Sequence, residues 1–318
     1  MSTAQSVRMA RAAAADRPLV GTVGISHPDR VIYPDQGTTK LALAHYYESV
    51  ADAMLPHVKG RPLTLVRCPD GIAADGRADT CFYMKHSKLW APPALRRVRI
   101  REKTKTGEYL VADTPDALVS LVQMGVVEVH TWNSTCDDLE RPDRVVLDID
   151  PGVDVGWPAV VDAARQIRDL LGALGLQTFV KTTGGRGLHV VVPLVPRADW
   201  QECLAFARAV AEALTRSDPG SFTMQFARAG RERLMLIDYL RNNRTNTSVA
   251  AFSTRARHGA PVSVPLTWRE LTTKLGPERF TMATVPARLR RATSDAWSGY
   301  FEVRQTLPLH AVEALNPM

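Results

Sequence analysis

The sequence contains 318 residues, enough for one large domain or two small ones with a sizeable core. Its 45% hydrophobic and 23% charged content is ordinary for a soluble globular protein, and its apolar runs are too short for a membrane span or a signal peptide. The net charge of +7 favours a polyanionic partner such as nucleic acid, although many cytosolic enzymes are mildly basic.

Two further features of the composition bear on organisation. The four cysteines are scattered and form no C-x-x-C pair, which predicts neither a zinc site nor a disulfide framework and fits a reducing cytoplasm. Residues 1–18 are rich in alanine and arginine without apolar periodicity, so we expect a disordered basic tail there. No internal repeat or low-complexity linker follows.

The first regular elements are expected after this tail. Residues 19–33 have an extended pattern, and a helix follows with Thr39 as its N-cap and apolar positions at 43, 47, 50 and 54. Lys40 then falls in the first helical turn, where the helix dipole disfavours a cation unless an anion is bound. A solvated surface lysine is the simpler alternative.

Two basic segments come next. After a short strand at residues 62–67, Phe82 and Tyr83 lie beside Lys85, a mixture that suits base stacking and phosphate contact but equally suits core packing. Residues 98–111 predict a hairpin with four basic residues alternating along it. Its basic face suits a nucleic-acid backbone, and a merely soluble edge hairpin is the alternative.

A buried strand then ends in acid. Residues 144–150 read as a strand, on which Asp148 and Asp150 share one face, and Pro151-Gly152 closes the stretch. Two like-facing carboxylates repel unless a cation neutralises them, and oxygen ligands favour Mg²⁺ or Mn²⁺. The alternative is a turn capped by two solvated aspartates. A strand before it, residues 126–130, carries His130 on the same face as Glu128, and such a histidine is usually structural.

A glycine-rich turn separates two further strands within residues 179–193. Three glycines allow close approach of backbone N–H groups, while Thr183, Arg186 and His189 supply a hydroxyl, a guanidinium and an imidazole. This combination suits a triphosphate, although the turn is neither a Walker A loop nor a dinucleotide fingerprint. The alternative is a hairpin that binds nothing.

The acidic pattern recurs at residues 233–240, a second buried strand that ends in Asp238. If the two acidic strands lie side by side, three carboxylates surround one point, as in sites that hold two ions about 3.5–4 Å apart for phosphoryl transfer. Residues 241–244 and 253–257 add further phosphate donors.

Together, D-x-D, T-G-G-R-G-L-H, I-D-Y-L-R-N and A-F-S-T-R-A-R, in this order, resemble the polymerase domain of bacterial ligase D, a branch of the archaeo-eukaryotic primase superfamily. The resemblance runs from His27 to Leu289. It implies an α+β fold with a primase-like catalytic core, in which mixed and antiparallel sheets are flanked by helices. We expect a primase-polymerase domain at 19–300 and a C-terminal extension at 301–318, in a free-standing monomeric polymerase without ligase or nuclease domains.

The resemblance also implies an activity. The expected enzyme is a DNA-dependent nucleotidyltransferase that fills gaps or extends ends of broken DNA, prefers ribonucleotides and uses two ions, Mn²⁺ or Mg²⁺. Its substrates would be gapped or broken DNA with a 5′-phosphate and an NTP or dNTP. The resemblance implies two partners, a separate DNA ligase and a Ku-like end binder. It implies no membrane association and a location in the cytoplasm, at the bacterial nucleoid. The alternatives are a non-catalytic end-bridging protein and a metal-dependent nuclease.

The resemblance assigns roles residue by residue. The metal-binding residues are Asp148, Asp150 and Asp238. The nucleotide-binding residues are Thr183, Arg186, His189, Arg255 and His130, with Phe82 and Tyr83 stacking on bases. The DNA-binding residues are Lys85 and, for the 5′-phosphate across a gap, Arg30 and Lys40. Residues 226–232 depart from the family pattern, leaving Arg228 and Arg231 as candidates for a missing triphosphate-binding residue.

Overall fold

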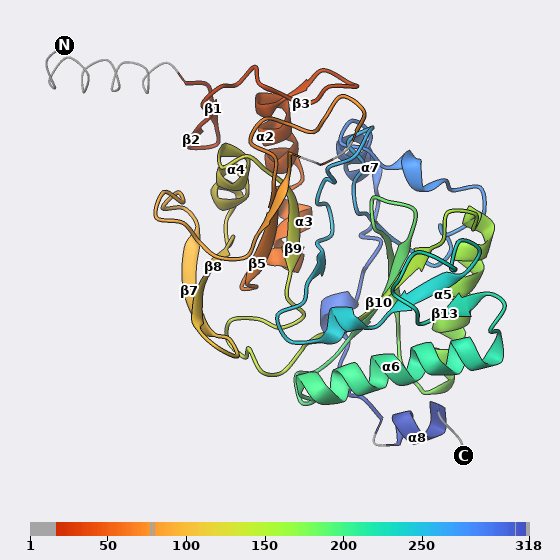
Figure 1. The fold of residues 1–318 in the computed structure, drawn as a ribbon. Coiled ribbons are helices and arrows are strands. Elements are labelled where there is room, and N and C mark those ends of the chain that lie inside the picture. Colours follow the sequence, from red (N-terminus) through yellow and green to blue (C-terminus); the bar gives the residue numbers. More distant parts are fainter. Residues whose placement is uncertain (1–16, 77, 79, 309, 316–318) are drawn as a thin grey trace, which may run out of the picture.

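The computed structural model describes residues 17–76, 78, 80–308 and 310–315. The predicted basic tail therefore lies outside the described residues, apart from Arg17 and Pro18. The expected α+β architecture is confirmed: two main sheets lie side by side with helices on their outer faces (Figure 1). No helix in the described part of the chain is long and apolar enough to cross a membrane.

The N-terminal part begins with short strands and a helix pair. The strands are β1 (Leu19–Val20), β2 (Val23–Gly24), β3 (Val31–Tyr33) and β4 (Thr38–Thr39), and the helices are α2 (Lys40–Ser49) and α3 (Ala51–Val58). Thr39 is the N-cap of α2 as predicted, because its hydroxyl accepts a hydrogen bond of 3.2 Å from the N–H of Ala42. The predicted apolar stripe is buried, although the helix is divided at Val50.

The smaller sheet is antiparallel with strand order β15-β9-β5-β6. Its strands are β5 (Leu63–Arg67), β6 (Phe82–Met84), β9 (Val126–Thr131) and β15 (Ser248–Val249). Helix α4 (Pro115–Gln123) packs on α2 and on β9. The predicted basic hairpin is present as β7 (Arg96–Arg101) and β8 (Thr106–Val111).

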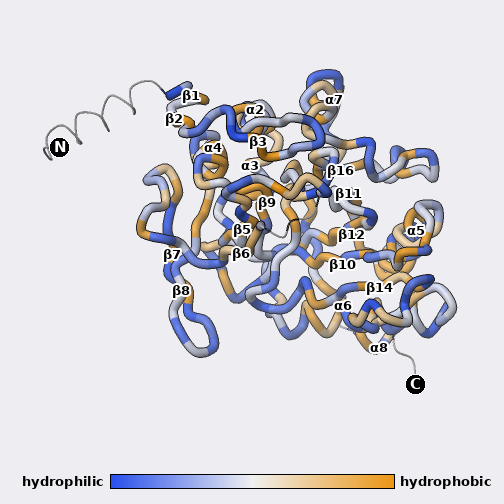
Figure 2. The backbone as a smooth tube through the Cα atoms, turned by 45° about the horizontal axis from the view of Figure 1, so that its top comes forward, coloured by the Kyte–Doolittle hydropathy of each residue, from blue (hydrophilic) through white to orange (hydrophobic). Residues whose placement is uncertain are grey.

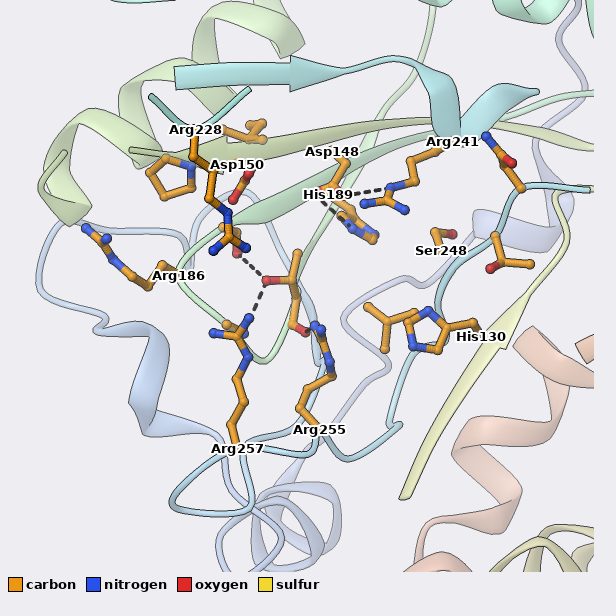
Figure 3. A pocket seen from close by; sticks show the side chains of 18 of the residues that line it. His130, Asp148, Asp150, Arg186, His189, Arg228, Arg241, Ser248, Arg255 and Arg257 are labelled. Atoms are coloured by element: carbon orange, nitrogen blue, oxygen red, sulfur yellow. Dashed lines mark hydrogen bonds and ion pairs between the residues drawn. The ribbon is translucent and has the colours of Figure 1, made fainter. Parts of the chain in front are cut away.

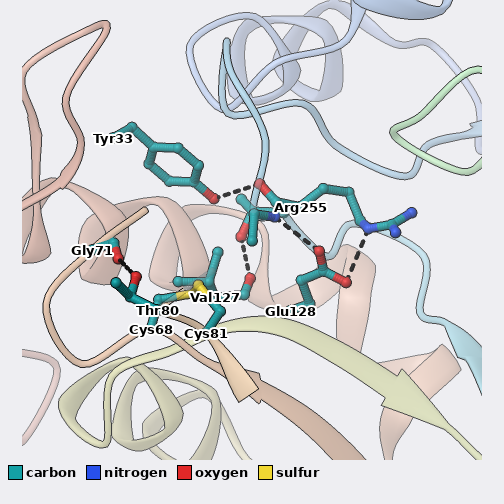
Figure 4. The surroundings of a disulfide bond; sticks show 10 residues. Tyr33, Cys68, Gly71, Thr80, Cys81, Val127, Glu128 and Arg255 are labelled. Atoms are coloured by element: carbon teal, nitrogen blue, oxygen red, sulfur yellow. Dashed lines mark hydrogen bonds and ion pairs between the residues drawn. A yellow bond between two sulfur atoms is a disulfide. The ribbon is translucent and has the colours of Figure 1, made fainter. Parts of the chain in front are cut away.

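A disulfide bond joins Cys68 to Cys81, so the expectation of no disulfide is wrong (Figure 4). The reason is the antiparallel register of β5 and β6, in which Arg67 pairs with Phe82. Cys68 follows Arg67 and Cys81 precedes Phe82, so this register brings the two cysteines opposite each other. A separation of 13 residues along the chain thus becomes direct contact in space. Cys136 and Cys203 are free.

The larger sheet has strand order β13-β14-β10-β12-β11-β16. Its strands are β10 (Arg144–Pro151), β11 (Phe179–Thr182), β12 (Leu188–Pro193), β13 (Phe222–Thr223), β14 (Met235–Asp238) and β16 (Pro265–Leu266). Helices α5 (Trp157–Ala173) and α6 (Trp200–Ser217) cover one face. Hydrophobic segments gather in these strands and in the helix faces that meet them, while exposed loops are hydrophilic (Figure 2).

The register of this sheet places its polar residues in one row. Asp148 on β10 pairs with Asp238 on β14 and with His189 on β12, and His189 pairs in turn with Lys181 on β11. Directly opposed residues of antiparallel strands share a face, so the row points away from α5 and α6. The apolar residues that alternate with Asp148 on β10 are fully buried beneath the helices.

An asparagine completes the pairing of β10 where β14 ends. After Asp238 the chain turns into a short 3₁₀ segment, η1 (Leu240–Asn242), and the Asn242 amide bonds both backbone groups of Val146. Its Nδ2 donates to the Val146 carbonyl at 2.7 Å, and its Oδ1 accepts from the Val146 N–H at 2.8 Å. Asn242 therefore takes the place of a strand residue at this edge.

The C-terminal part wraps around the larger sheet. It contains η2 (Pro277–Arg279), α7 (Val285–Arg291), η3 (Tyr300–Glu302) and α8 (Ala311–Leu315). Gln305 bonds backbone groups of Gln177, Pro193 and Val195, and α8 packs on α6. The described part of the predicted extension at 301–318 is thus docked on the larger sheet and on α6.

Replacing both Cys68 and Cys81 by serine should lower the free energy of unfolding by about 3 kcal/mol in a non-reducing buffer, because the cross-link restricts the unfolded chain. Urea denaturation, followed with and without dithiothreitol, measures this. Cys136→Ser is the control and should leave the midpoint unchanged. A wild-type midpoint that ignores the reductant would contradict the prediction.

Asn242→Ala should lower the free energy of unfolding by about 3 kcal/mol, because two buried backbone groups of Val146 lose their partners. Asn243→Ala is a matched control at an exposed neighbouring position and should change stability by less than about 0.5 kcal/mol. Equal denaturation midpoints for the two variants would show that Asn242 does not support β10.

Candidate active site

A cavity of about 910 Å³ lies between the two sheets (Figure 3). Thr64, Tyr83 and His130 line it from the smaller sheet, and Asp148 and His189 line it from the larger one. The loops that follow β10, β11 and β14 complete its wall. Every predicted catalytic or nucleotide-binding residue contributes to this lining except Phe82 and Asp238, and Asp238 lies directly beside Asp148.

The two aspartates of neighbouring strands converge on one cation. Arg241 Nε lies 3.0 Å from an Asp148 oxygen and 3.1 Å from an Asp238 oxygen. Asp150 is on the same face of β10 but more exposed, and its oxygen lies 2.7 Å from Arg231 Nη2. The structure therefore brings the three predicted carboxylates to one region, each paired with an arginine.

Burial has opposite outcomes for the two central carboxylates. It favours the neutral form of both, but the charges and hydrogen bonds of His189 and Arg241 outweigh it at Asp148 and hold the pKa of that carboxyl well below its ordinary value. At Asp238, burial prevails over Arg241, and Asp148 adds repulsion, so the pKa rises to about 6. The negative charge of the pair is incompletely compensated.

These residues fit a hard divalent ion. The carboxylate oxygens of Asp148 and Asp238 already converge on a positively charged nitrogen, and oxygen donors suit Mg²⁺ or Mn²⁺. With the guanidinium in this position, no three Asp, Glu, His or Cys side chains among the described residues are arranged to hold a metal. Binding an ion there would require Arg241 to move aside.

The glycine-rich turn is built for close approach. Thr183 Oγ1 accepts from the N–H of Gly185 at 3.2 Å and donates to the Gly187 carbonyl at 3.1 Å, so the hydroxyl closes the turn. Gly184 has a φ of +68°, and a Cβ on Gly187 would lie 2.1 Å from the Ile149 carbonyl oxygen. Arg186, at the tip, lines the cavity and donates to the Val155 carbonyl at 2.7 Å.

A buried glutamate orients the predicted arginine. Glu128 lies 3.0 Å from Arg255 Nε and 2.8 Å from His130 Nε2, and it also accepts from the N–H of Ala256 at 2.8 Å. Arg255 Nη1 in turn donates to the Thr183 carbonyl at 2.6 Å, which links the two sheets. Sequence reasoning gave Glu128 no role, although its shared face with His130 was the signal that could have found it.

His189 contacts Asp148 from the neighbouring strand β12. The ring is 2% exposed, and its Nε2 lies 3.3 Å from an Asp148 oxygen. Its Nδ1 has no hydrogen-bond partner among the described residues. Burial and the nearby charge of Lys181 lower its pKa to about 4, so the imidazole is neutral at pH 7.

The aromatic pair of β6 is divided between two faces. Tyr83 lines the cavity, is 68% exposed and has its ring centroid 6.0 Å from that of His130. Lys85 shares this face. Phe82 points to the opposite face, as alternation along a strand requires.

The two residues predicted to hold a 5′-phosphate lie outside the cavity, on the N-terminal segment. Lys40 is 6% exposed, so the alternative of a solvated surface lysine is wrong. Its Nζ donates to the Ser26 carbonyl and to the carbonyl and side chain of Gln123, at 2.9–3.0 Å. Burial and the charge of nearby Arg30 lower its pKa to about 8.

The arginines around the cavity differ in their availability. Arg231 is buried against Asp150, whereas Arg228 is exposed at the cavity wall. Arg257, which the sequence reasoning did not single out, approaches the glycine-rich turn beside Arg255 (Figure 3). Burial and the charge of Arg255 lower its pKa, as expected where cations gather around space for an anion.

Comparison with known proteins agrees with this geometry. Residues 39–297 match the family model of the LigD primase-polymerase domain. The chain is 38% identical over 304 residues to the multifunctional non-homologous end joining protein LigD of Pseudomonas aeruginosa, covering 95% of this chain and 36% of that protein. It is 27% identical over 285 residues to the bifunctional LigD of Bacillus subtilis, covering 89% of this chain and 45% of that one.

A solved structure matches as well. The polymerase domain of Mycobacterium tuberculosis ligase D in complex with DNA aligns with a TM-score of 0.79 and 31% identity, covering 87% of this chain and 96% of that domain. The chain thus spans less than half the length of these LigD relatives and nearly all of the solved polymerase domain. With its paired aspartates and glycine-rich turn, the chain belongs to the LigD primase-polymerase domain family.

Proposed function

We propose that this chain is a DNA-dependent nucleotidyltransferase that fills gaps or extends the ends of broken DNA, with a preference for ribonucleotides and with Mn²⁺ or Mg²⁺ as cofactor. The observation that carries the proposal is a cavity between the sheets that is lined by Asp148, a glycine-rich turn and several arginines, with Asp238 directly beside Asp148. The solved relative is a polymerase domain in complex with DNA, which supports DNA as the substrate.

The residues of the cavity divide the work. Asp148, Asp150 and Asp238 would hold the ions, which when bound lower the pKa of a primer 3′-hydroxyl and neutralise the triphosphate. Backbone N–H groups of the turn, with Arg186 and Arg255, would hold the triphosphate in line for attack. His130, held by Glu128, would contact the nucleotide, and His189 would keep Asp148 oriented and ionised.

Four side chains at the cavity wall complete the proposed nucleotide and DNA contacts. Tyr83 presents an exposed ring on which a base can stack, and Lys85 lies two residues further on the same face. Arg228 and Arg257 are the basic residues free to approach the outer phosphates, whereas Arg231 is engaged by Asp150. We therefore assign the missing triphosphate contact to Arg228 rather than to Arg231.

The two alternative functions explain fewer of the residues in the site. A metal-dependent nuclease needs the carboxylates but no cradle for a triphosphate, and an end-bridging protein needs neither. Incorporation of a labelled nucleotide separates the three. For the proposed enzyme, which we take to act as a monomer at the nucleoid, a DNA ligase and a Ku-like end binder are the expected partners.

Asp148→Asn and Asp238→Asn should each reduce Mn²⁺-dependent ribonucleotide incorporation into a gapped duplex by about 10³-fold or more, because the acidic pair loses a charged oxygen ligand. Asp162→Asn, at an exposed position on α5, is the matched control and should keep full activity. Thermal unfolding of all three variants checks their folding. Near-normal incorporation by either active-site variant would refute the assignment.

Lys40 should make discrimination for a 5′-phosphate depend on pH. Its pKa of about 8 means that the ammonium is charged at pH 7 and largely neutral at pH 9, while a 5′-phosphate stays dianionic and Arg30 stays charged. The ratio of affinities for phosphorylated and unphosphorylated gaps, measured by fluorescence anisotropy, should therefore fall by up to about 10-fold from pH 7 to pH 9.

The control variants test whether this dependence belongs to Lys40. Lys40→Ala should give a low, pH-independent ratio, and Lys85→Ala should retain the wild-type pH profile. If Lys40→Ala weakened binding to both gaps equally, Lys40 would have a structural role only.

A further inference from the structure

A second stack of aromatic and cationic side chains lies on the face of β6 opposite the cavity side. The Arg67 guanidinium is 5.3 Å from the ring centroid of Phe82 and 4.5 Å from that of Trp90. Arg67 pairs with Phe82 across β5 and β6, so both point away from Tyr83. Neither Phe82, Arg67 nor Trp90 lines the nucleotide cavity.

The stack is fixed from several sides. Arg67 Nε donates to the Met124 carbonyl at 2.7 Å, and the Cys68–Cys81 disulfide joins the residues that follow Arg67 and precede Phe82. The loop that carries Trp90 is held by backbone bonds, because the N–H of Ser87 donates to the Glu108 carbonyl and Arg97 Nη2 donates to the Ala91 carbonyl at 2.9 Å. A position held in this way is preorganised for a ligand.

The aromatic rings of the stack are only half covered. Trp90 is 53% exposed and Phe82 is exposed as well, so a tryptophan face remains open to solvent. Leaving an indole ring exposed to water is unfavourable, so an exposed indole beside a partly buried cation indicates a surface that a ligand covers. Every nucleobase presents a flat face that stacks on such a ring, and arginine adds a cation–π contribution.

The position of the stack beside Lys40 and Arg30 indicates which part of a DNA substrate would reach it. Lys40 and Arg67 donate to consecutive carbonyls at the end of α4, those of Gln123 and Met124. Arg30 donates to the Pro69 carbonyl, two residues beyond Arg67. A 5′-phosphate held by Arg30 and Lys40 would therefore carry its own base toward Trp90.

We propose that Trp90, stacked on Arg67, is an end-binding platform that receives the terminal base at a 5′-phosphorylated DNA end. This inference rests on the proposed DNA-dependent function and adds a contact outside the nucleotide cavity. It requires no metal and no nucleotide, because none of the residues involved takes part in the catalytic cluster.

The test uses a DNA hairpin with a 5′-phosphorylated end, in which 2-aminopurine is the terminal base, without metal or nucleotide. The wild type should bind it with a change in 2-aminopurine emission. Trp90→Ala should weaken binding about 5-fold or more and abolish the emission change, and Trp90→Phe should retain most of both. Leu89→Ala, a fully exposed neighbour, is the matched control and should behave as the wild type.

Each contrary outcome has a distinct meaning. Wild-type binding and emission in Trp90→Ala would overturn the platform while leaving the proposed polymerase intact. If 2-aminopurine placed only at an internal position gave the same Trp90-dependent emission change, stacking would not be confined to the terminal base and the platform would be overturned. Equal losses of binding in Trp90→Ala and Trp90→Phe with lowered thermal midpoints would reduce Trp90 to a structural role and also overturn it. Failure of the wild type to bind any hairpin would refute the DNA-dependent function itself.

Discussion

The pairing of Asp148 with Asp238 across two central strands is the constraint on which the site depends. Two carboxylates placed side by side in a largely buried position repel one another, and the cost is met by the charge of Arg241 and by the neutral imidazole of His189, which contacts Asp148 from β12. Removing Arg241 would leave the negative charge of the pair uncompensated. The sheet can hold this cluster because buried apolar residues on the reverse face of β10 anchor the strand beneath α5 and α6.

Compensation by arginine has a consequence for metal binding. A guanidinium carries one positive charge and directional N–H groups, whereas a divalent ion carries two charges and accepts oxygen ligands from several directions. If an ion replaced Arg241, the positive charge beside Asp238, the carboxylate whose pKa is raised, would therefore increase. Without an ion, Arg241 is thus the group that stabilises the acidic pair.

Much of the site was predictable from local patterns. Strands that end in aspartate and a glycine-rich turn between strands can each be recognised within a single short segment of the sequence. The N-cap at Thr39 and the hairpin, predicted at residues 98–111 and observed at 96–111, follow such patterns. The same patterns placed Asp148 and Asp238 at strand ends, but their adjacency was only a condition of the predicted site. The resemblance to the ligase D polymerase domain fixed the fold, which composition and periodicity alone would have left open.

What could not be predicted depends on side chains that reach across the chain. Arg241 returns to Asp148 over 93 residues, and Asn242 bonds Val146 over 96 residues. The disulfide depends on strand register rather than on cysteine spacing, and the burial of Lys40 depends on Gln123, 83 residues away. Such contacts leave no periodic trace, since each involves a single residue type at a single position.

The two faces of β6 carry two separate groups of side chains. Because successive side chains alternate, Tyr83 and Lys85 face the nucleotide cavity while Phe82 joins Arg67 and Trp90. An aromatic pair in sequence is therefore not a pair in space, and a single stacking role cannot describe both rings.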